Sequence, residues 1–332
     1  MTRKEEIFFP NFFLFILSDV AGKELSSIII SYLFSFTLKD VSMVVKDRHV
    51  MELLGRARVV VENGKVVEVG KPMTEYCPIF EKIRGYKKLT ENIVRENTEF
   101  RIADFGLFTG DREIEMETFV GFGASEVFQT VLDRGLLDAA VIAGDGIGTI
   151  ITANPTLVQG IGARISGLVE TTPIPKLIER VKEAGGIVLD PETAKLDMAA
   201  GVEKAIELGH KKIGVTVASL DDAKKIRDVA AEHPDVTVVE FGVHTTGMPP
   251  EEAREFVNLV DLTTGCASKW VRHYAAERGP LVQGGTAVPI YAFTQIGKEL
   301  LIERAKDVEQ PLLLNTQELP HLPEKKQPRP LV

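Results

Sequence analysis

Short apolar segments alternate with longer amphipathic segments from residue 124 to residue 305, and this alternation limits the possible folds most strongly. The apolar segments have the length and composition of β-strands. They are residues 139–143, 186–189, 212–217, 236–241, 261–264 and 288–293. The predicted helices between them are residues 124–134, 174–184, 193–208, 220–232, 250–260, 267–277 and 295–305. Strands and helices in this order favour right-handed βαβ crossovers. We therefore expect a three-layer α/β domain with a mainly parallel, Rossmann-like sheet over residues 100–315.

Side-chain oxygens mark the starts of three of these helices. Thr172, Asp190 and Ser219 each stand where a hydroxyl or carboxylate can accept from a free backbone amide of the first turn. Such N-caps stabilise a helix because the first amides have no partner within it. We expect all three residues to cap helices.

A small β-hairpin region is expected ahead of this domain, over residues 43–99. Apolar residues flank the pair Asn63-Gly64, and both residues tolerate the positive φ angles of a type I′ turn. Residues 47–54 are expected to form a short helix, and a second helix begins after Thr90. Residues 316–332 are rich in proline, lysine and glutamate, which predicts a disordered tail.

Residues 1–42 differ from the rest of the chain in composition. Two apolar, aromatic segments, residues 7–17 and 28–36, are each shorter than the roughly 18 residues that span a bilayer as a helix. This part could be an interfacial anchor, a packed segment, or the product of a start site assigned too far upstream. We favour the last interpretation, with Met43 or Met51 as later starts, and we expect no membrane span.

Charge and cysteine content exclude several classes of protein. The net charge of −9 argues against a nucleic-acid-binding protein, because phosphate backbones require a positive surface. Two cysteines, Cys77 and Cys266, cannot form a disulfide framework, so a reducing cytoplasm is the expected location. The histidines lack the HxH and HExxH spacings of common metal sites. The sequence therefore names neither a metal nor a cofactor.

Three chemically active residues follow predicted strands. In open α/β sheets, ligands bind beyond the carboxyl ends of parallel strands, and Asp145, His244 and Cys266 stand at such positions. His244 could act as a general base. Cys266 precedes a predicted helix and Lys269, both of which favour a reactive thiolate. Each residue also has a purely structural interpretation, namely a local turn for Asp145, a backbone-bonded His244 and a buried Cys266.

Glycine-rich segments between residues 121 and 167 predict backbone that approaches a ligand closely. Turns and helix packing explain the glycines as well, and no dinucleotide fingerprint or Walker sequence is complete. The candidate ligand-binding residues are Gly121, Gly123, Ser125, Gly146, Gly148, Arg164, Thr245 and Lys269.

Several motifs occur together in a recognisable order. They are VGFGASE at 120–126, DGIGTIIT at 145–152, LVQGIG at 157–162, RISGLV at 164–169, TPIP at 172–175, VHTTG at 243–247, CASK at 266–269 and GKELL at 297–301. Together they resemble methanogenesis marker protein 8, a family of uncharacterised proteins of methane-producing archaea. The resemblance covers residues 47–314. It implies a protein of an anaerobic cytoplasm and assigns no catalytic residue.

Three functions are compatible with this resemblance. The first is an enzyme acting on a small anionic metabolite or cofactor precursor, with Asp145, His244 and Cys266 as the reacting groups. The second is a non-catalytic assembly factor for methyl-coenzyme M reductase or its nickel cofactor. The third is a regulator that binds a small ligand. The expected partner is thus a small molecule or a methanogenesis protein.

Overall fold

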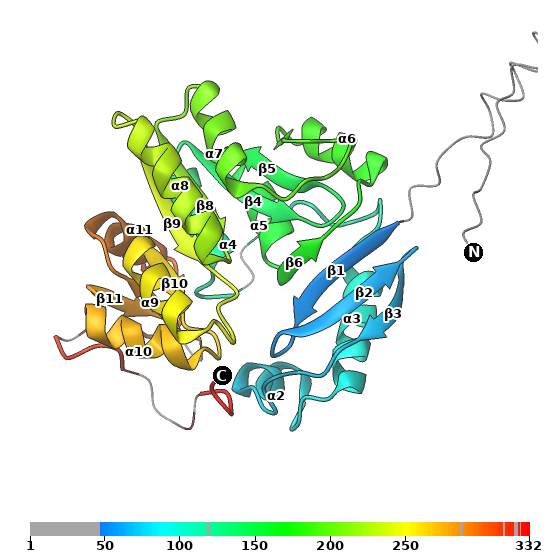
Figure 1. The fold of residues 1–332 in the computed structure, drawn as a ribbon, viewed down its shortest axis with the longest axis horizontal. Helices are drawn as coiled ribbons and strands as arrows, with labels where there is room; N and C mark the ends of the chain where they lie inside the picture. The colour runs from blue at the N-terminus through cyan, green and yellow to red at the C-terminus, as the bar shows by residue number, and fades with distance from the viewer. Residues whose placement is uncertain (1–46, 118–119, 286–287, 315, 322–324, 326) are drawn as a thin grey trace, which may run out of the picture. The chain divides into compact units, whose positions relative to one another are not determined.

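The computed structural model describes residues 47–117, 120–285, 288–314, 316–321, 325 and 327–332 (Figure 1). Residues 46–332 form one unit. The predicted extension at residues 1–42 lies outside the described residues. The predicted domain boundaries remain predictions, and the smaller of the two sheets combines three strands of the hairpin region with a fourth strand from residues 167–170.

The smaller sheet is antiparallel and has the strand order β3-β2-β1-β6. Its strands are β1 (Arg48–Leu53), β2 (Ala57–Glu62), β3 (Lys65–Val69) and β6 (Gly167–Glu170). Helices α2 (Pro78–Arg84) and α3 (Glu91–Phe105) belong to the same part of the chain. The predicted hairpin is confirmed, since Asn63 and Gly64 have φ angles of 50° and 70°. Thr90 caps α3 as expected.

The predicted helix at residues 47–54 is wrong, because this segment is strand β1. It pairs with β2 on one side and with β6, more than 100 residues later in the chain, on the other. Both edges of β1 are therefore hydrogen-bonded, and its consecutive side chains are buried or half-buried, so the strand shows no regular alternation of polar and apolar residues. A sequence window cannot reveal such a remote partner.

The larger sheet has the order β11-β12-β10-β9-β8-β4-β5-β7. Its strands are β4 (Ala139–Gly144), β5 (Gly148–Thr152), β7 (Ile187–Val188), β8 (Lys212–Val217), β9 (Thr237–Gly242), β10 (Leu262–Thr264), β11 (Val282–Gly284) and β12 (Ile290–Ala292). Only the neighbours β4, β8, β9 and β10 run parallel, and the flanking pairs are antiparallel. The sheet is thus partly parallel, where the sequence predicted a mainly parallel one.

Hydrophobic residues of the larger sheet divide between two core clusters, as the alternation of side chains along a strand requires. On β4, Ala140 and Ile142 belong to one cluster, and Ala139 and Val141 to the other. The first cluster includes residues of α4 (Ala124–Asp133), α5 (Pro155–Gly162), α6 (Pro175–Glu183) and α11 (Gln295–Ala305). The second includes residues of α7 (Met198–Glu207), α8 (Leu220–Glu232), α9 (Pro250–Leu259) and α10 (Lys269–Arg278).

Two of the three predicted helix caps differ from the structure. Ser219 caps α8 by accepting from the amide of Asp222, as expected. Asp190 instead caps a short turn, and α7 begins only after Asp197. Thr172 bonds to the backbone of Arg48, which joins the loop before α6 to strand β1. The sequence also missed β5 and α5, which lie within the glycine-rich segments.

Residues 327–332 connect distant parts of the fold. Arg329 forms a two-way backbone bridge with Tyr76, just before α2. The amide of Val332 donates to the carbonyl of Ala267, and the amide of Lys269 donates to the carbonyl of Val332. We call this segment the strap, because it joins the smaller-sheet region to the start of α10. Across the described part of the chain, no helix is long and apolar enough to cross a membrane.

Candidate functional site

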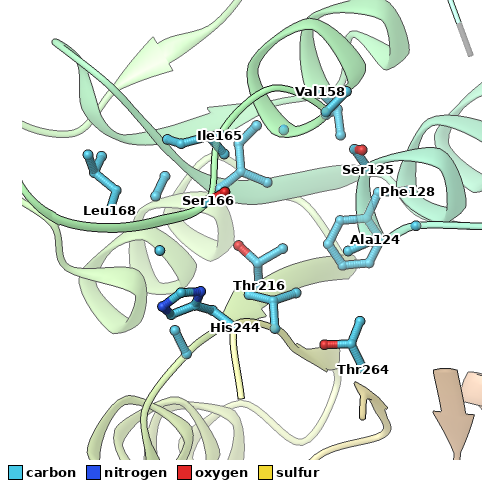
Figure 2. A pocket seen from close by; sticks show the side chains of 18 of the residues that line it. Ala124, Ser125, Phe128, Val158, Ile165, Ser166, Leu168, Thr216, His244 and Thr264 are labelled. Carbon is cyan, nitrogen blue, oxygen red and sulfur yellow. The ribbon is translucent and has the colours of Figure 1, made fainter. Parts of the chain in front are cut away.

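A cavity of about 470 Å³ lies at the carboxyl ends of the parallel strands β4, β8, β9 and β10. The start of α4, the loop after α5 at residues 163–166 and the start of β6 contribute further walls. Figure 2 shows side chains from these walls around one space, with the His244 ring and Ser125 on different sides. The cavity has the size of small-molecule sites and lies where such sites occur in open α/β sheets.

Most residues that line the cavity are apolar, and they include Phe128, Ile142, Val158, Ile165 and Leu168. The polar side chains at the wall are those of Ser125, Glu126, Ser166, Thr216, Asp222, His244, Thr264 and Cys266. No arginine or lysine is among the lining residues that the structure describes. The cavity lining is therefore suited to contact the apolar part of a ligand.

His244 forms a pair with a carboxylate from the smaller sheet. Nε2 of His244 lies 2.7 Å from Oε2 of Glu52, which is on strand β1. The same oxygen accepts from Nε of Arg56 at 2.9 Å. Burial tends to raise the pKa of Glu52, but hydrogen bonds from His244 and Arg56, together with the charge of Arg56, outweigh it, so the pKa is lowered. Glu52 is thus ionised at neutral pH and holds a proton on Nε2.

The other imidazole nitrogen is available for chemistry. Among the described residues, none forms a hydrogen bond with Nδ1 of His244. A neutral ring with its proton on Nε2 carries a lone pair on Nδ1, which is the requirement for a general base. The carboxylate would then stabilise the positive charge that the ring acquires when it accepts a proton.

Gly167 creates the space for the imidazole. A Cβ atom at this position would lie 2.2 Å from Nε2 of His244, far inside contact distance. Gly167 begins strand β6 and lies beside Glu52 in the ladder between β6 and β1. The glycine of the RISGLV motif, which has no side chain, therefore leaves room for the His244 ring. The sequence patterns did not indicate this role.

Cys266 lies on the same cavity, at the end of β10. Its Sγ is 3.2 Å from Oγ1 of Thr264, and its carbonyl accepts from the guanidinium of Arg272. The thiol is partly exposed. Cys266 precedes the N-cap Ser268 by two residues, so the predicted position near a helix start is observed.

Both His244 and Cys266 have left-handed backbone. Their φ angles are 55° and 38°. Side chains with a Cβ atom rarely adopt such angles, which cost of order 1–3 kcal/mol. Strain of this kind gathers at functional sites, where the surrounding structure imposes it. Two strained residues on one cavity therefore support a role for this cavity beyond packing.

Asp145, the third residue that we expected to be catalytic, lies away from the cavity. Its side chain is completely buried. Oδ1 is 3.2 Å from Nε of Arg112, and Oδ2 accepts from the amide of Phe108 at 2.7 Å. Arg112 also donates to the carbonyls of Gly160 and Ile161. Asp145 therefore connects a loop after α3 to the turn between β4 and β5.

The eight predicted ligand-binding residues divide between the cavity and other places. Only Gly123 and Ser125 line the cavity. Gly146 and Gly148 have positive φ angles in the turn between β4 and β5, where Ile174 and Ala194 pack against them. The remaining residues make other contacts. Gly121 lies near Val308, Arg164 stacks on Phe105, Thr245 donates to the carbonyl of Thr264, and Lys269 lies over Trp270.

Sequence reasoning missed Glu52, Ser166 and Thr216. Glu52 was placed in a predicted helix, so nothing indicated that it would face a histidine 192 residues later. Ser166 and Thr216 lie within the RISGLV motif and a predicted strand, where a serine or threonine is unremarkable. Among the described residues, no group of three or more histidine, cysteine, aspartate or glutamate side chains could hold a metal ion.

Comparison with known sequences places the chain among archaeal proteins. Residues 49–306 match the model of a family described as "Uncharacterized protein conserved in archaea (DUF2099)". The chain belongs to this archaeal family. It is 49% identical over 288 residues to the uncharacterized protein MJ0054 of Methanocaldococcus jannaschii, across 86% of this chain and 100% of that protein. The resemblance seen in the motifs is thus supported at the level of an archaeal family.

Proposed function

We propose that this chain is an enzyme that binds a small, mainly apolar molecule in the cavity and reacts with it through His244 and Cys266. The observation that carries the proposal is the Glu52–His244 pair, whose Nε2–Oε2 distance is 2.7 Å, on a cavity that also contains a thiol. We also propose that the helices and the larger sheet form a three-layer, Rossmann-like arrangement. It leaves Asp145 outside the chemistry, because both its oxygens are engaged elsewhere.

His244 would act as the general base. Glu52 fixes the tautomer and the orientation of the ring, and Nδ1 accepts a proton from the reacting group. The reacting group is either the thiol of Cys266 or a substrate hydroxyl. A thiolate formed in this way attacks an electrophilic carbon, and the protonated imidazole returns the proton to the leaving group.

The substrate is proposed to be neutral at its reacting end. Glu126 and Asp222 bring negative charge to the wall, whereas arginine and lysine are missing from the described lining. The expected anionic metabolite would therefore have to keep its charge outside this cavity. The resemblance to methanogenesis marker protein 8 makes small molecules of methanogens the first compounds to test.

Untargeted mass spectrometry tests the proposal without a known substrate. The purified protein and its His244→Gln variant are incubated with a small-molecule extract of a methanogen. We expect at least one compound to be consumed by the unmodified protein, with the rate reduced roughly 10²–10⁴-fold in the variant, because general-base catalysis contributes that much. Cys266→Ser then shows whether the thiol reacts, since a hydroxyl keeps the contact with Thr264 but is a weaker nucleophile.

His273→Gln is the matched control. His273 is an exposed histidine on α10 and does not line the cavity. Like His244 it pairs with a carboxylate, that of Glu277 one helical turn later. We expect it to behave like the unmodified protein. If no compound changes with the unmodified protein, or if His244→Gln consumes the same compounds equally fast, the enzyme proposal is rejected. Co-purification of a methanogenesis protein would then favour the assembly-factor hypothesis.

A further inference from the structure

Several arginines gather near the loop at residues 163–166, where Arg101 donates to the carbonyl of Arg164 and to Oγ of Ser166. Arg101 lies on α3, and Arg84 is the last residue of α2. Burial lowers the pKa of Arg101 to about 10, and the positive charges of Arg164, Arg112 and Arg84 add to this effect. Like charges repel one another, so such a cluster costs free energy unless negative charge balances it.

Part of this charge is balanced within the chain. Arg112 pairs with the buried carboxylate of Asp145. The negative charges of Glu113 and Asp104 act on Arg164 and partly oppose the lowering of its pKa by burial. Carboxylates thus offset the charge of Arg112 and part of the charge of Arg164. They leave Arg101 and Arg84 to be explained.

Arg101 has only neutral partners among the described residues. Its Nε donates to Oδ1 of Asn97 at 3.1 Å. Its Nη1 donates to the carbonyl of Arg164 at 2.9 Å and to Oγ of Ser166 at 3.3 Å. Nη2 makes no hydrogen bond in the described part of the chain. Two N–H groups of a half-buried cation are thus left for a further acceptor.

Aromatic rings hold the neighbouring guanidinium groups in place. Arg84 lies over Phe100 at 3.6 Å, and Arg164 lies over Phe105 at 3.8 Å. The two rings contact each other edge to face, with 5.6 Å between centroids. Stacked arginines lose less conformational freedom when they bind an anion, because their planes are already fixed.

We propose that Arg84, Arg101 and Arg164 form a binding site for a dianionic phosphate group. Guanidinium groups bind phosphate through pairs of N–H donors, and two negative charges balance a cluster of this size better than one. This site is separate from the chemistry proposed for His244. It shares a wall with the cavity, because Ser166 contacts Arg101 and also lines the cavity.

Calorimetric titration of the full chain with inorganic phosphate tests this site, with sodium chloride at equal ionic strength as the reference. We expect saturable binding by the unmodified protein. Arg84→Gln and Arg101→Gln should each weaken it roughly tenfold or more, because each variant removes a charge-assisted hydrogen-bond donor. Arg84→Gln is the more decisive variant, because Arg84 is exposed and its replacement leaves the core intact.

Arg254→Gln is the matched control. Arg254 also stacks on an aromatic ring, that of Tyr274 at 4.8 Å, but it lies on α9, away from the cluster. We expect its phosphate affinity to equal that of the unmodified protein. The proposal is overturned if the unmodified protein shows no saturable binding, or if Arg84→Gln binds phosphate as tightly as Arg254→Gln.

Discussion

Individual residues in this protein take their roles from partners that are remote in the sequence. Asp145 stands between two glycines, which suggested a ligand-binding turn. Its partners are Arg112, 33 residues earlier, and the amide of Phe108. His244 and Cys266 were correctly placed at strand ends and do line one cavity. The sequence could give their position along the sheet, but it could not give the carboxylate that orients His244.

The role of Asp145 in holding the fold leads to a stability prediction. Asp145→Asn should lower the free energy of unfolding by about 3–5 kcal/mol, because it leaves Arg112 as a buried charge without its counterion. Chemical denaturation measures the change. Asp111→Asn is the control, since Asp111 forms an exposed ion pair with Lys176 and its loss should change stability little. Equal effects of the two variants would contradict the structural role.

At the scale of secondary-structure elements, strand β9 carries a carboxylate into the core. Glu240 is completely buried, and its burial raises its pKa to about 8, with a further contribution from Asp261. Arg227 opposes this shift, and its Nε lies 2.8 Å from Oε1 of Glu240. Neither carboxylate oxygen receives a well-directed hydrogen bond from the described residues. The apolar composition of residues 236–241 predicted the strand but not this buried charge.

The pH dependence of stability should therefore reflect Glu240. Its pKa is 4.5 when unfolded and about 8 when folded, so between these values the folded state binds more protons. Stability from this group is complete below pH 4.5 and is lost as pH rises through 8. Glu240→Gln should remove this loss and make the protein more stable than the unmodified chain at pH 8 to 9. Denaturant titrations between pH 4.5 and pH 9 measure the free energy of unfolding of both proteins. The same pH dependence of this free energy in both proteins would contradict the prediction.

At the scale of the whole described chain, the candidate site joins two sheets. Glu52 comes from the smaller sheet and His244 from the larger one, so their pairing depends on how the two sheets pack. The strand–helix alternation predicted the parallel centre of the larger sheet. It could not predict that β6, between two elements of the larger part, pairs with β1. Pairing between remote strands leaves no local pattern.

The strap gives this arrangement a second connection. Removing residues 327–332 should loosen the start of α10, because the amide of Lys269 loses its acceptor at Val332. Hydrogen exchange should become faster at Lys269 and at Tyr76, which bonds to Arg329. Amides in the centre of β8 should be unaffected and serve as the internal reference. Unchanged exchange at Tyr76 and Lys269 would show that the strap does not hold these elements in solution.

The left-handed backbone at His244 and Cys266 has an evolutionary consequence. Glycine adopts φ angles of 55° and 38° without the steric cost that a Cβ atom brings. A lineage released from selection on activity could thus gain stability by replacing either residue with glycine. The imidazole and the thiol would then be among the first groups lost by drift. A descendant with glycine at both positions would have the same fold and would have abandoned the chemistry.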